Sequence, residues 1–331
     1  MSELARVVVT DLIPEPLECE RRVLDGYAQV VALDIQQQSE LQDQLNDADA
    51  VMIYHYLRLT REYIQRLSRC KVIVRPGVGY DNIDLAAAGE HGIPVCNVPD
   101  YGAEEVADSA LGMALGLARG THFLNSRLRR GVGAWNADQA VPLHRLRGRV
   151  FGIIGCGRIG AAAALRAKAF GFDVVFYDPP LRDGVEKSLG VRRVDSLEEL
   201  LQQSHLLSLH CPLTPQTRGM IGAAELALLP AGAIVINTAR GGVLDTAALV
   251  EALAQGHLSG AGIDVLESEP PSANSTVLKA WRDPTHPAHD RMILNPHAAF
   301  YCEEGIAELR TKASQEVLRG LQGMPFRNRV H

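Results

Sequence analysis

No hydrophobic run in the chain reaches the about 20 residues that a helix needs to cross a bilayer. The N-terminal segment MSELARVVVTD lacks a basic region followed by a long apolar core, so we expect no signal peptide and a cytoplasmic protein. The chain also has no excess of positive charge, with 33 Lys and Arg residues against 39 Asp and Glu. The net charge of -6 provides no broad basic field for nucleic acid or an anionic membrane, so neither is an expected partner.

Spacings typical of metal sites are missing as well. The six cysteines include no Cys-x-x-Cys pair, and we interpret them as small thiols in a reducing compartment. None of the eleven histidines forms a His-x-x-x-His pair. His286 and His289 come near to this spacing, but they lie in a proline-rich segment. The sequence therefore predicts no metal site.

What the chain does contain is an ordinary globular composition, with 47% hydrophobic and 22% charged residues. Its 331 residues correspond to two domains at roughly 150 residues each. Apolar, β-branched runs alternate with helical periodicity almost throughout, which predicts parallel sheets covered by helices on both faces. The strand-like runs are 6–10, 50–54, 71–74, 150–154, 173–177, 205–209, 233–237 and 292–295.

The order of these segments indicates how the two domains are built. Residues 150–295 form one uninterrupted series of strands and helices, and the first hundred residues form a smaller series of their own. The longest helical stretch is 103–131. The final helical stretch, 303–323, has no following strand, so it is free to return to the first unit and make that domain discontinuous.

A glycine-rich turn follows the strand-like run 150–154. Gly155, Gly157 and Gly160 form a GxGxxG pattern between a strand and an alanine-rich helix, and Asp178 ends the next strand. This pattern brings backbone and a helix N-terminus close to a pyrophosphate, while the acid binds the adenosine ribose. A carboxylate there favours NAD over NADP. Two alternatives are NADP binding and a purely structural turn.

Three isolated polar residues each follow an apolar segment. They are Arg240, Glu269 and His297, and each alone has a structural explanation as a turn or loop residue. Together they form a chemically complete set at the expected ligand-binding edge of a parallel sheet. Histidine transfers a proton, a carboxylate orients it, and arginine grips a substrate carboxylate. Reduction of a 2-oxo acid by a nicotinamide cofactor needs all three of these chemical roles.

Four motifs carry a family resemblance: GIIGCGRIG, VINTARGGVLD, AGIDVLESEP and NPHAAFY. With them the chain resembles the D-isomer-specific 2-hydroxyacid dehydrogenases, and within that family the C-terminal binding protein subgroup. The resemblance covers about residues 50–320. It implies an α/β fold of two Rossmann-like parallel-sheet domains, one flavodoxin-like and one NAD-binding, with the active site in a cleft between them. The implied domains are 1–98 plus 301–331 for substrate and 99–300 for NAD.

The resemblance also assigns roles to individual residues. It implies that Arg240 binds the substrate, that Glu269 is the partner of the catalytic histidine, and that His297 is the proton donor. The implied cofactor contacts are Ile154, Gly155, Gly157, Arg158, Ile159, Gly160, Asp178, Cys211, Pro212, Thr217, Thr238, Ala239, Asp264, His297 and Ala299. The implied substrate contacts are His55, Arg75, Val78, Gly79, Arg240 and Phe300.

Family members are usually dimers joined through the cofactor domain, so the resemblance predicts a homodimer that uses the long helical stretch near 103–131. The chain departs from the C-terminal binding proteins at Phe300, where they carry tryptophan, and at Val106, where they carry threonine. Its segment 270–292 is several residues longer. We interpret this insert as a tolerated surface loop, with a role at the pocket mouth or in an oligomer contact as the alternative.

Two functions remain open at this point. The first is an NAD(H)-dependent enzyme that interconverts a 2-oxo acid and its (R)-2-hydroxy acid. The alternative is an NAD(H)-sensing scaffold that binds peptides in the manner of a corepressor. The substrate is open too. His55, Arg75 and Arg240 favour a substrate with a second anionic group, whereas Tyr54, Tyr56 and Phe300 favour an apolar or aromatic side chain.

Overall fold

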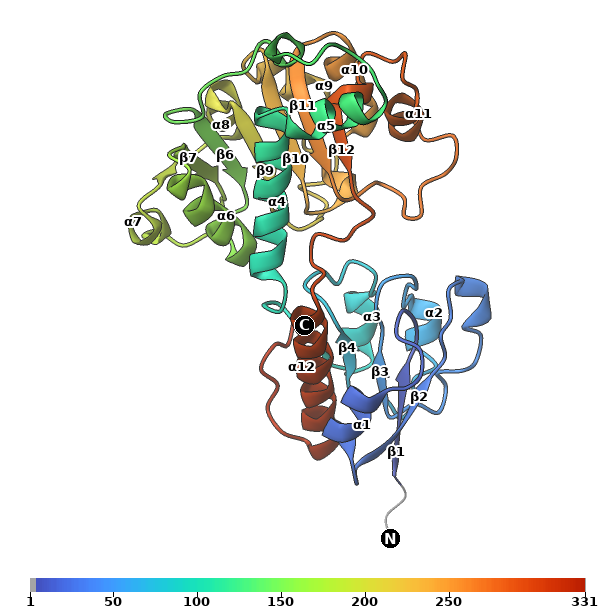
Figure 1. Cartoon of the computed structure of the whole chain (residues 1–331). Coiled ribbons are helices and arrows are strands. Elements are labelled where there is room, and N and C mark those ends of the chain that lie inside the picture. The colour runs from blue at the N-terminus through green and yellow to red at the C-terminus, as the bar shows by residue number, and fades with distance from the viewer. Residues whose placement is uncertain (1–3, 331) are drawn as a thin grey trace. The chain divides into compact units, whose positions relative to one another are not determined.

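The computed structural model describes residues 4–330, which fold into two compact units, each with its own parallel sheet (Figure 1). Of the described residues, the smaller unit comprises 4–102 and 301–330, and the larger unit comprises Ala103–Phe300. Two parallel α/β sheets confirm the predicted fold class. Within the described residues, no helix combines the length and the apolar character that crossing a membrane requires.

The sheet of the smaller unit has the strand order β2-β1-β3-β4-β5, and all its pairings are parallel. This is the flavodoxin-like order, in which ligands bind beyond the carboxyl ends of the strands. The strands are β1 (Ala5–Val9), β2 (Ala28–Ala32), β3 (Ala50–Met52), β4 (Ile73–Arg75) and β5 (Val95–Asn97).

Helices cover this smaller sheet. The helices are α1 (Glu18–Leu24), α2 (Arg61–Ile64), α3 (Leu85–Glu90) and α12 (Glu303–Gln322). The C-terminal helix α12 packs against α1 and against β3 and β4. The fully buried Glu20 of α1 forms an ion pair of 2.6 Å with Arg310 of α12, which fixes the two helices to each other.

The sheet of the larger unit has seven strands in the order β12-β11-β10-β9-β6-β7-β8. Reading from β8, the first six strands follow the dinucleotide-binding order, with the switch of direction at β6 and β9. The strands are β6 (Val150–Ile154), β7 (Asp173–Tyr177), β8 (Arg192–Arg193), β9 (Leu206–Leu209), β10 (Ala233–Asn237), β11 (Leu258–Ile263) and β12 (Met292–Leu294).

Strands β6, β7, β9 and β10 contribute side chains to two separate cores, one on each face of the sheet. Ile153 packs with α4 and α6 on one face, and its neighbour Ile154 packs with the opposite core, as the period-two geometry of a strand requires. The helices of the unit are α4 (Ala103–Ala118), α5 (Thr121–Arg129), α6 (Arg158–Ala169), α7 (Val185–Leu189), α8 (Leu197–Gln203), α9 (Ala223–Leu228), α10 (Thr246–Ala254) and α11 (Thr276–Arg282). Helices thus cover both faces of this sheet, and the loops that follow its strands, including the glycine-rich turn after β6, lie at the ends of the strands.

Two sequence predictions need correction. The helical stretch 103–131 is broken, because Gly120 adopts the left-handed conformation with φ of 65° and ends α4 before α5 begins. Strands β2, β5, β8 and β11 were not predicted. The residues of β11, LSGAGI, contain two glycines and no β-branched run, so the strand is formed by pairing with β10 and β12 rather than by local propensity.

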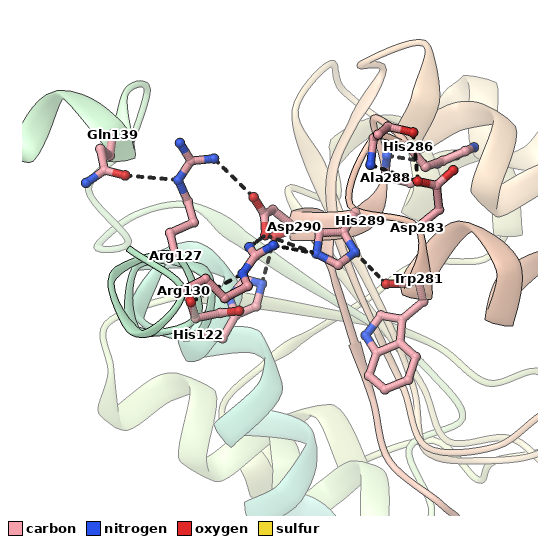
Figure 2. Close-up of polar contacts among 12 residues, drawn as sticks. His122, Arg127, Arg130, Gln139, Trp281, Asp283, His286, Ala288, His289 and Asp290 are labelled. Atoms are coloured by element: carbon pink, nitrogen blue, oxygen red, sulfur yellow. Dashed lines mark hydrogen bonds and ion pairs between the residues drawn. The ribbon is translucent and has the colours of Figure 1, made fainter. Parts of the chain in front are cut away.

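The insert 270–292 is more than a surface loop. It contains α11, and its side chains Val277, Ala280 and Ala288 are buried. Asp290 at its end ties α5 to the segment before β12 (Figure 2). The Asp290 carboxylate accepts from Arg127 and Arg130 at 3.1 and 2.8 Å, so the insert is anchored within the larger unit.

Replacing two glycines of the turn after β6 by alanine should have different effects on stability, because their surroundings differ. A Cβ on Gly160 would lie 2.0 Å from the carbonyl oxygen of Gly155. Among residues 4–330, a Cβ on Gly157 would have no heavy atom within 4 Å apart from Gly157 itself and its two chain neighbours. We expect Gly160→Ala to lower the free energy of unfolding by about 2–4 kcal/mol, and Gly157→Ala to leave it nearly unchanged. Urea unfolding of the two variants checks this, and equal losses would contradict it.

Candidate active site

The turn between β6 and α6 forms a cradle of backbone. Gly155 has a φ of 86°, and a Cβ there would lie 2.7 Å from the backbone N of Cys211. Gly157 is the residue before the 12-residue helix α6, and Arg158 and Ile159 are its first two residues. The helix N-terminus and the open space at Gly157 fit a pyrophosphate group, because unsatisfied N–H groups there favour an anion.

Two further loops lie beside this turn. Asp178 follows β7, and its carboxylate accepts from the backbone N of Cys156 at 2.7 Å. Cys211 follows β9, and burial raises the pKa of its thiol to about 11 and that of Cys156 to about 12, so both stay neutral. The turn after Cys211 is closed by the Thr217 hydroxyl, which donates to the Pro212 carbonyl at 2.6 Å. These residues meet at the carboxyl edge of the sheet.

Arg240 follows β10, and its backbone is held by Asn237, the last residue of that strand. The Asn237 side chain accepts from Ala239 N and donates to the Arg240 carbonyl, both at 3.0 Å. The fully buried Asn237 thereby fixes the turn from which the guanidinium extends. Thr238 lies between them with its hydroxyl oxygen buried, and within residues 4–330 this oxygen has no hydrogen-bond partner.

The loop after Arg240 contacts the loop that carries Glu269. A Cβ on Gly241 would lie 1.9 Å from the carbonyl carbon of Leu266, so only glycine allows the two backbones to approach this closely. Leu266 N donates to one Glu269 carboxylate oxygen at 2.8 Å. The structure therefore places the loops of Arg240 and Glu269 side by side.

Glu269 and His297 are in direct contact. The other Glu269 carboxylate oxygen lies 2.6 Å from Nδ1 of His297, and both side chains are about four-fifths buried, with 23% and 20% exposed. A carboxylate only accepts, so Nδ1 carries the proton, and proton exchange with a ligand would take place at Nε2. The ring of Phe300 packs edge-on against His297 at 6.0 Å. This is the geometry of an oriented general acid or base.

Asp264 joins these loops. Its carboxylate accepts from the backbone N–H groups of Ala298 and Ala299 at 2.9 and 3.1 Å, and its carbonyl accepts from His297 N at 2.8 Å. Burial raises the pKa of Asp264, and the two backbone hydrogen bonds oppose this shift. These contacts hold His297 at a φ of 52°, a left-handed conformation that is rare outside glycine.

The other predicted site residues lie in the smaller unit, at the carboxyl ends of β3 and β4. His55 follows β3, and Arg75 is the last residue of β4. The Arg75 guanidinium folds back over Gly77, where a Cβ would lie 1.4 Å from Nη1. The Val78 carbonyl accepts from the Asn97 side chain at 2.8 Å, which fixes the loop that continues through Gly79.

Sequence reasoning missed two polar residues of the larger unit. Asn237 was counted only as the end of a strand. His210 follows β9, and its Nε2 lies 2.9 Å from the Ser208 hydroxyl. Its Nδ1 is buried and, among the described residues, has no hydrogen-bond partner. Both follow apolar runs, as Arg240 does, and that signal was sufficient to find them.

Comparison with known proteins gives a consistent picture. Residues 111–299 match the family model described as "D-isomer specific 2-hydroxyacid dehydrogenase, NAD binding domain". C-terminal-binding protein 1 of Caenorhabditis elegans is 36% identical over 96% of this chain and 44% of its own length. D-3-phosphoglycerate dehydrogenase of Methanocaldococcus jannaschii is 35% identical over 99% of this chain and 60% of its own length. The chain thus spans about half the length of these curated relatives.

A solved structure extends the similarity to the whole fold. The crystal structure of D-lactate dehydrogenase from Aquifex aeolicus, complexed with NAD and lactic acid, is 30% identical to this chain and superimposes on it with a TM-score of 0.84. The similarity covers 96% of each chain.

Burial of His210 predicts a specific loss of stability in acid. Burial lowers the pKa of His210 to about 4, below its unfolded value near 6.5. Its contribution to stability is therefore fully present above the unfolded pKa and is lost as the pH falls from about 6.5 toward 4, up to about 3 kcal/mol. His210→Gln removes this loss, which urea unfolding between pH 7 and 4.5 measures. His144→Gln, at an exposed position, is the control, and an equal pH dependence in both variants argues against this role for His210.

Proposed function

Because the chain belongs to the D-isomer specific 2-hydroxyacid dehydrogenase family, we propose that it is an NAD(H)-dependent oxidoreductase that interconverts a 2-oxo acid and its (R)-2-hydroxy acid. The observation that carries this proposal is the 2.6 Å contact between His297 and Glu269. It lies in the unit whose sheet has the dinucleotide-binding order, and the loop of Arg240 contacts the loop of Glu269.

Each of the three residues has a defined task in this reaction. The bound nicotinamide supplies or accepts the hydride. His297 protonates the forming alkoxide from Nε2, or takes the proton in the reverse direction. Glu269 stabilises the positive charge on the imidazole and keeps its orientation through Nδ1. Arg240 binds the substrate carboxylate and polarises the neighbouring carbonyl.

We propose that the larger unit binds the cofactor and that the cofactor is NAD. The turn at Gly155, Gly157 and Gly160 holds the pyrophosphate, and Asp264 accepts from the nicotinamide amide. Asp178 accepts from the ribose hydroxyl groups and repels the 2′-phosphate of NADP. The remaining proposed contacts are Ile154, Arg158, Ile159, Cys211, Pro212, Thr217, Thr238, Ala239, His297 and Ala299.

We propose that the smaller unit binds the substrate through His55, Arg75 and the backbone N–H groups of Val78 and Gly79. Phe300 adds an apolar contact. His55 and Arg75 favour a substrate with a second anion, whereas Tyr56 and Phe300 favour an apolar or aromatic side chain. Tyr54 is only 1% exposed, so its ring packs within the smaller unit instead. Ranking kcat/KM for oxaloacetate, phenylpyruvate and glyoxylate distinguishes the two, because clear preference for a monoanion excludes the second-anion model.

A second candidate is a binding module, favoured by the 36% identity to a protein named C-terminal-binding protein 1. In this alternative the chain binds NADH tightly and recruits peptides without turnover. Absorbance at the NADH band during incubation with the three 2-oxo acids separates the candidates. Oxidation of NADH supports the enzyme, and tight NADH binding with no oxidation supports the module.

Removing the arginine tests the catalytic assignment. We expect Arg240→Ala to lower kcat/KM for the best 2-oxo acid by about a thousandfold or more, because a charge-assisted, bidentate contact is lost. Arg240→Lys restores only a small part, because an ammonium lacks the planar fork. Steady-state kinetics of NADH oxidation with this 2-oxo acid, in wild type and both variants, measure these changes in kcat/KM. The control is Arg22→Ala, at an exposed position of α1, and near wild-type activity of Arg240→Ala contradicts the assignment.

We also propose that the chain forms a homodimer through the segment after α5. Trp135 is 89% exposed and Val141 is 74% exposed, and such exposed apolar groups mark interaction surfaces. We expect Trp135→Ser to weaken the dimer about a hundredfold, as loss of an interface tryptophan does. Light scattering over a dilution series measures this. Tyr27→Ser, another exposed aromatic position, is the control, and an unchanged dimer in Trp135→Ser contradicts this interface.

A further inference from the structure

The fully buried carboxylate of Asp11 has no role in the scheme above. Asp11 lies just beyond β1, at the carboxyl edge of the smaller sheet. A buried carboxylate costs several kcal/mol unless hydrogen bonds compensate for its lost hydration. Such a group is kept inside a protein only where several strong donors face it, so its donors identify what it holds in place.

The donors of Asp11 come from three consecutive residues of one loop. Its Oδ1 accepts from Tyr54 N at 2.9 Å, and its Oδ2 accepts from His55 N at 2.7 Å and Tyr56 N at 2.6 Å. The Thr10 hydroxyl donates to Oδ1 as well. Three successive N–H groups converge on one anion only in a particular backbone shape, so the carboxylate fixes the shape of this loop.

The same loop is held from its other side by Asn82. The Asn82 side chain donates to the carbonyls of Leu57 at 2.9 Å and Tyr54 at 3.3 Å. Tyr54 is itself buried, with 1% exposed, so its ring anchors the start of the loop. The segment that carries His55 is thus fixed by backbone contacts on both sides.

We propose that Asp11 is a positioning residue for substrate binding: its carboxylate fixes the backbone of residues 54–56 and thereby sets the position of His55. This inference rests on the proposed function, because it takes His55 as a substrate contact. Both oxygens of Asp11 are needed, since each accepts from a different part of the loop. Asparagine at this position keeps one acceptor and turns an NH2 group toward the remaining N–H donors.

Asp11→Asn tests the proposal, and Asp49→Asn is the matched control. Asp49 is also buried and also accepts from a backbone N–H, that of Arg6 at 2.8 Å, but it precedes β3 and so lies at the opposite end of the sheet. We expect Asp11→Asn to raise KM for the best 2-oxo acid by about tenfold or more, while kcat changes less and the Kd of NADH is unchanged. Asp49→Asn lowers thermal stability without changing KM. Equal KM values in wild type and Asp11→Asn, or equal rises in both variants, would overturn the proposal.

A second measurement does not depend on whether the variant folds. Amide hydrogen exchange of the wild-type protein should be slow at Tyr54, His55 and Tyr56, although they lie in a loop. Fast exchange at these three amides overturns the proposal outright. Slow exchange in a wild-type protein that oxidises NADH with none of the 2-oxo acids refutes the proposed function and, with it, the substrate role of His55. Slow exchange together with turnover supports the proposal, because a loop fixed by Asp11 requires both.

Discussion

The hydrogen bonds of Asp264 are the constraint on which the candidate site of the larger unit depends. Its backbone N donates to Asn237 O at the end of β10, while its carbonyl and carboxylate bind the backbone of residues 297–299. One residue therefore joins the ends of three neighbouring strands. The left-handed His297 and the buried Asn237 are both held by this network, which places His297 where its ring contacts Glu269.

Both units use the same physical device. In each, a carboxylate is buried just beyond an apolar strand and is compensated by backbone N–H groups: Asp264 in the larger unit and Asp11 in the smaller. Such a contact fixes a loop more precisely than a surface ion pair, because the backbone itself is the partner and solvent screens it little. Loop shape at the sheet edge is thus set from within each core.

The sequence predicts much of this because local signals were strong. The predicted strand-like runs 150–154, 173–177 and 233–237 have the same bounds as β6, β7 and β10. Helix α10 begins after Asp245, whose carboxylate accepts from the backbone N–H groups of Ala247 and Ala248, the usual cap of a helix N-terminus. Strand β11 was missed because tertiary pairing creates it. Glu269 and His297 are 28 positions apart in the sequence, and no local spacing rule predicts that they lie 2.6 Å apart. Their contact follows from the pairing of β11 with β12, which brings the loops after these strands together.

The discontinuity of the smaller unit has a consequence for biosynthesis. The larger unit is one continuous segment, whereas the smaller unit is completed only by α12, whose Arg310 pairs with the buried Glu20. A ribosome that makes the chain from its N-terminus therefore delivers every residue of the larger unit before α12 emerges. Until then Glu20 lacks its arginine, so the first hundred residues reach their final packing last although they are translated first.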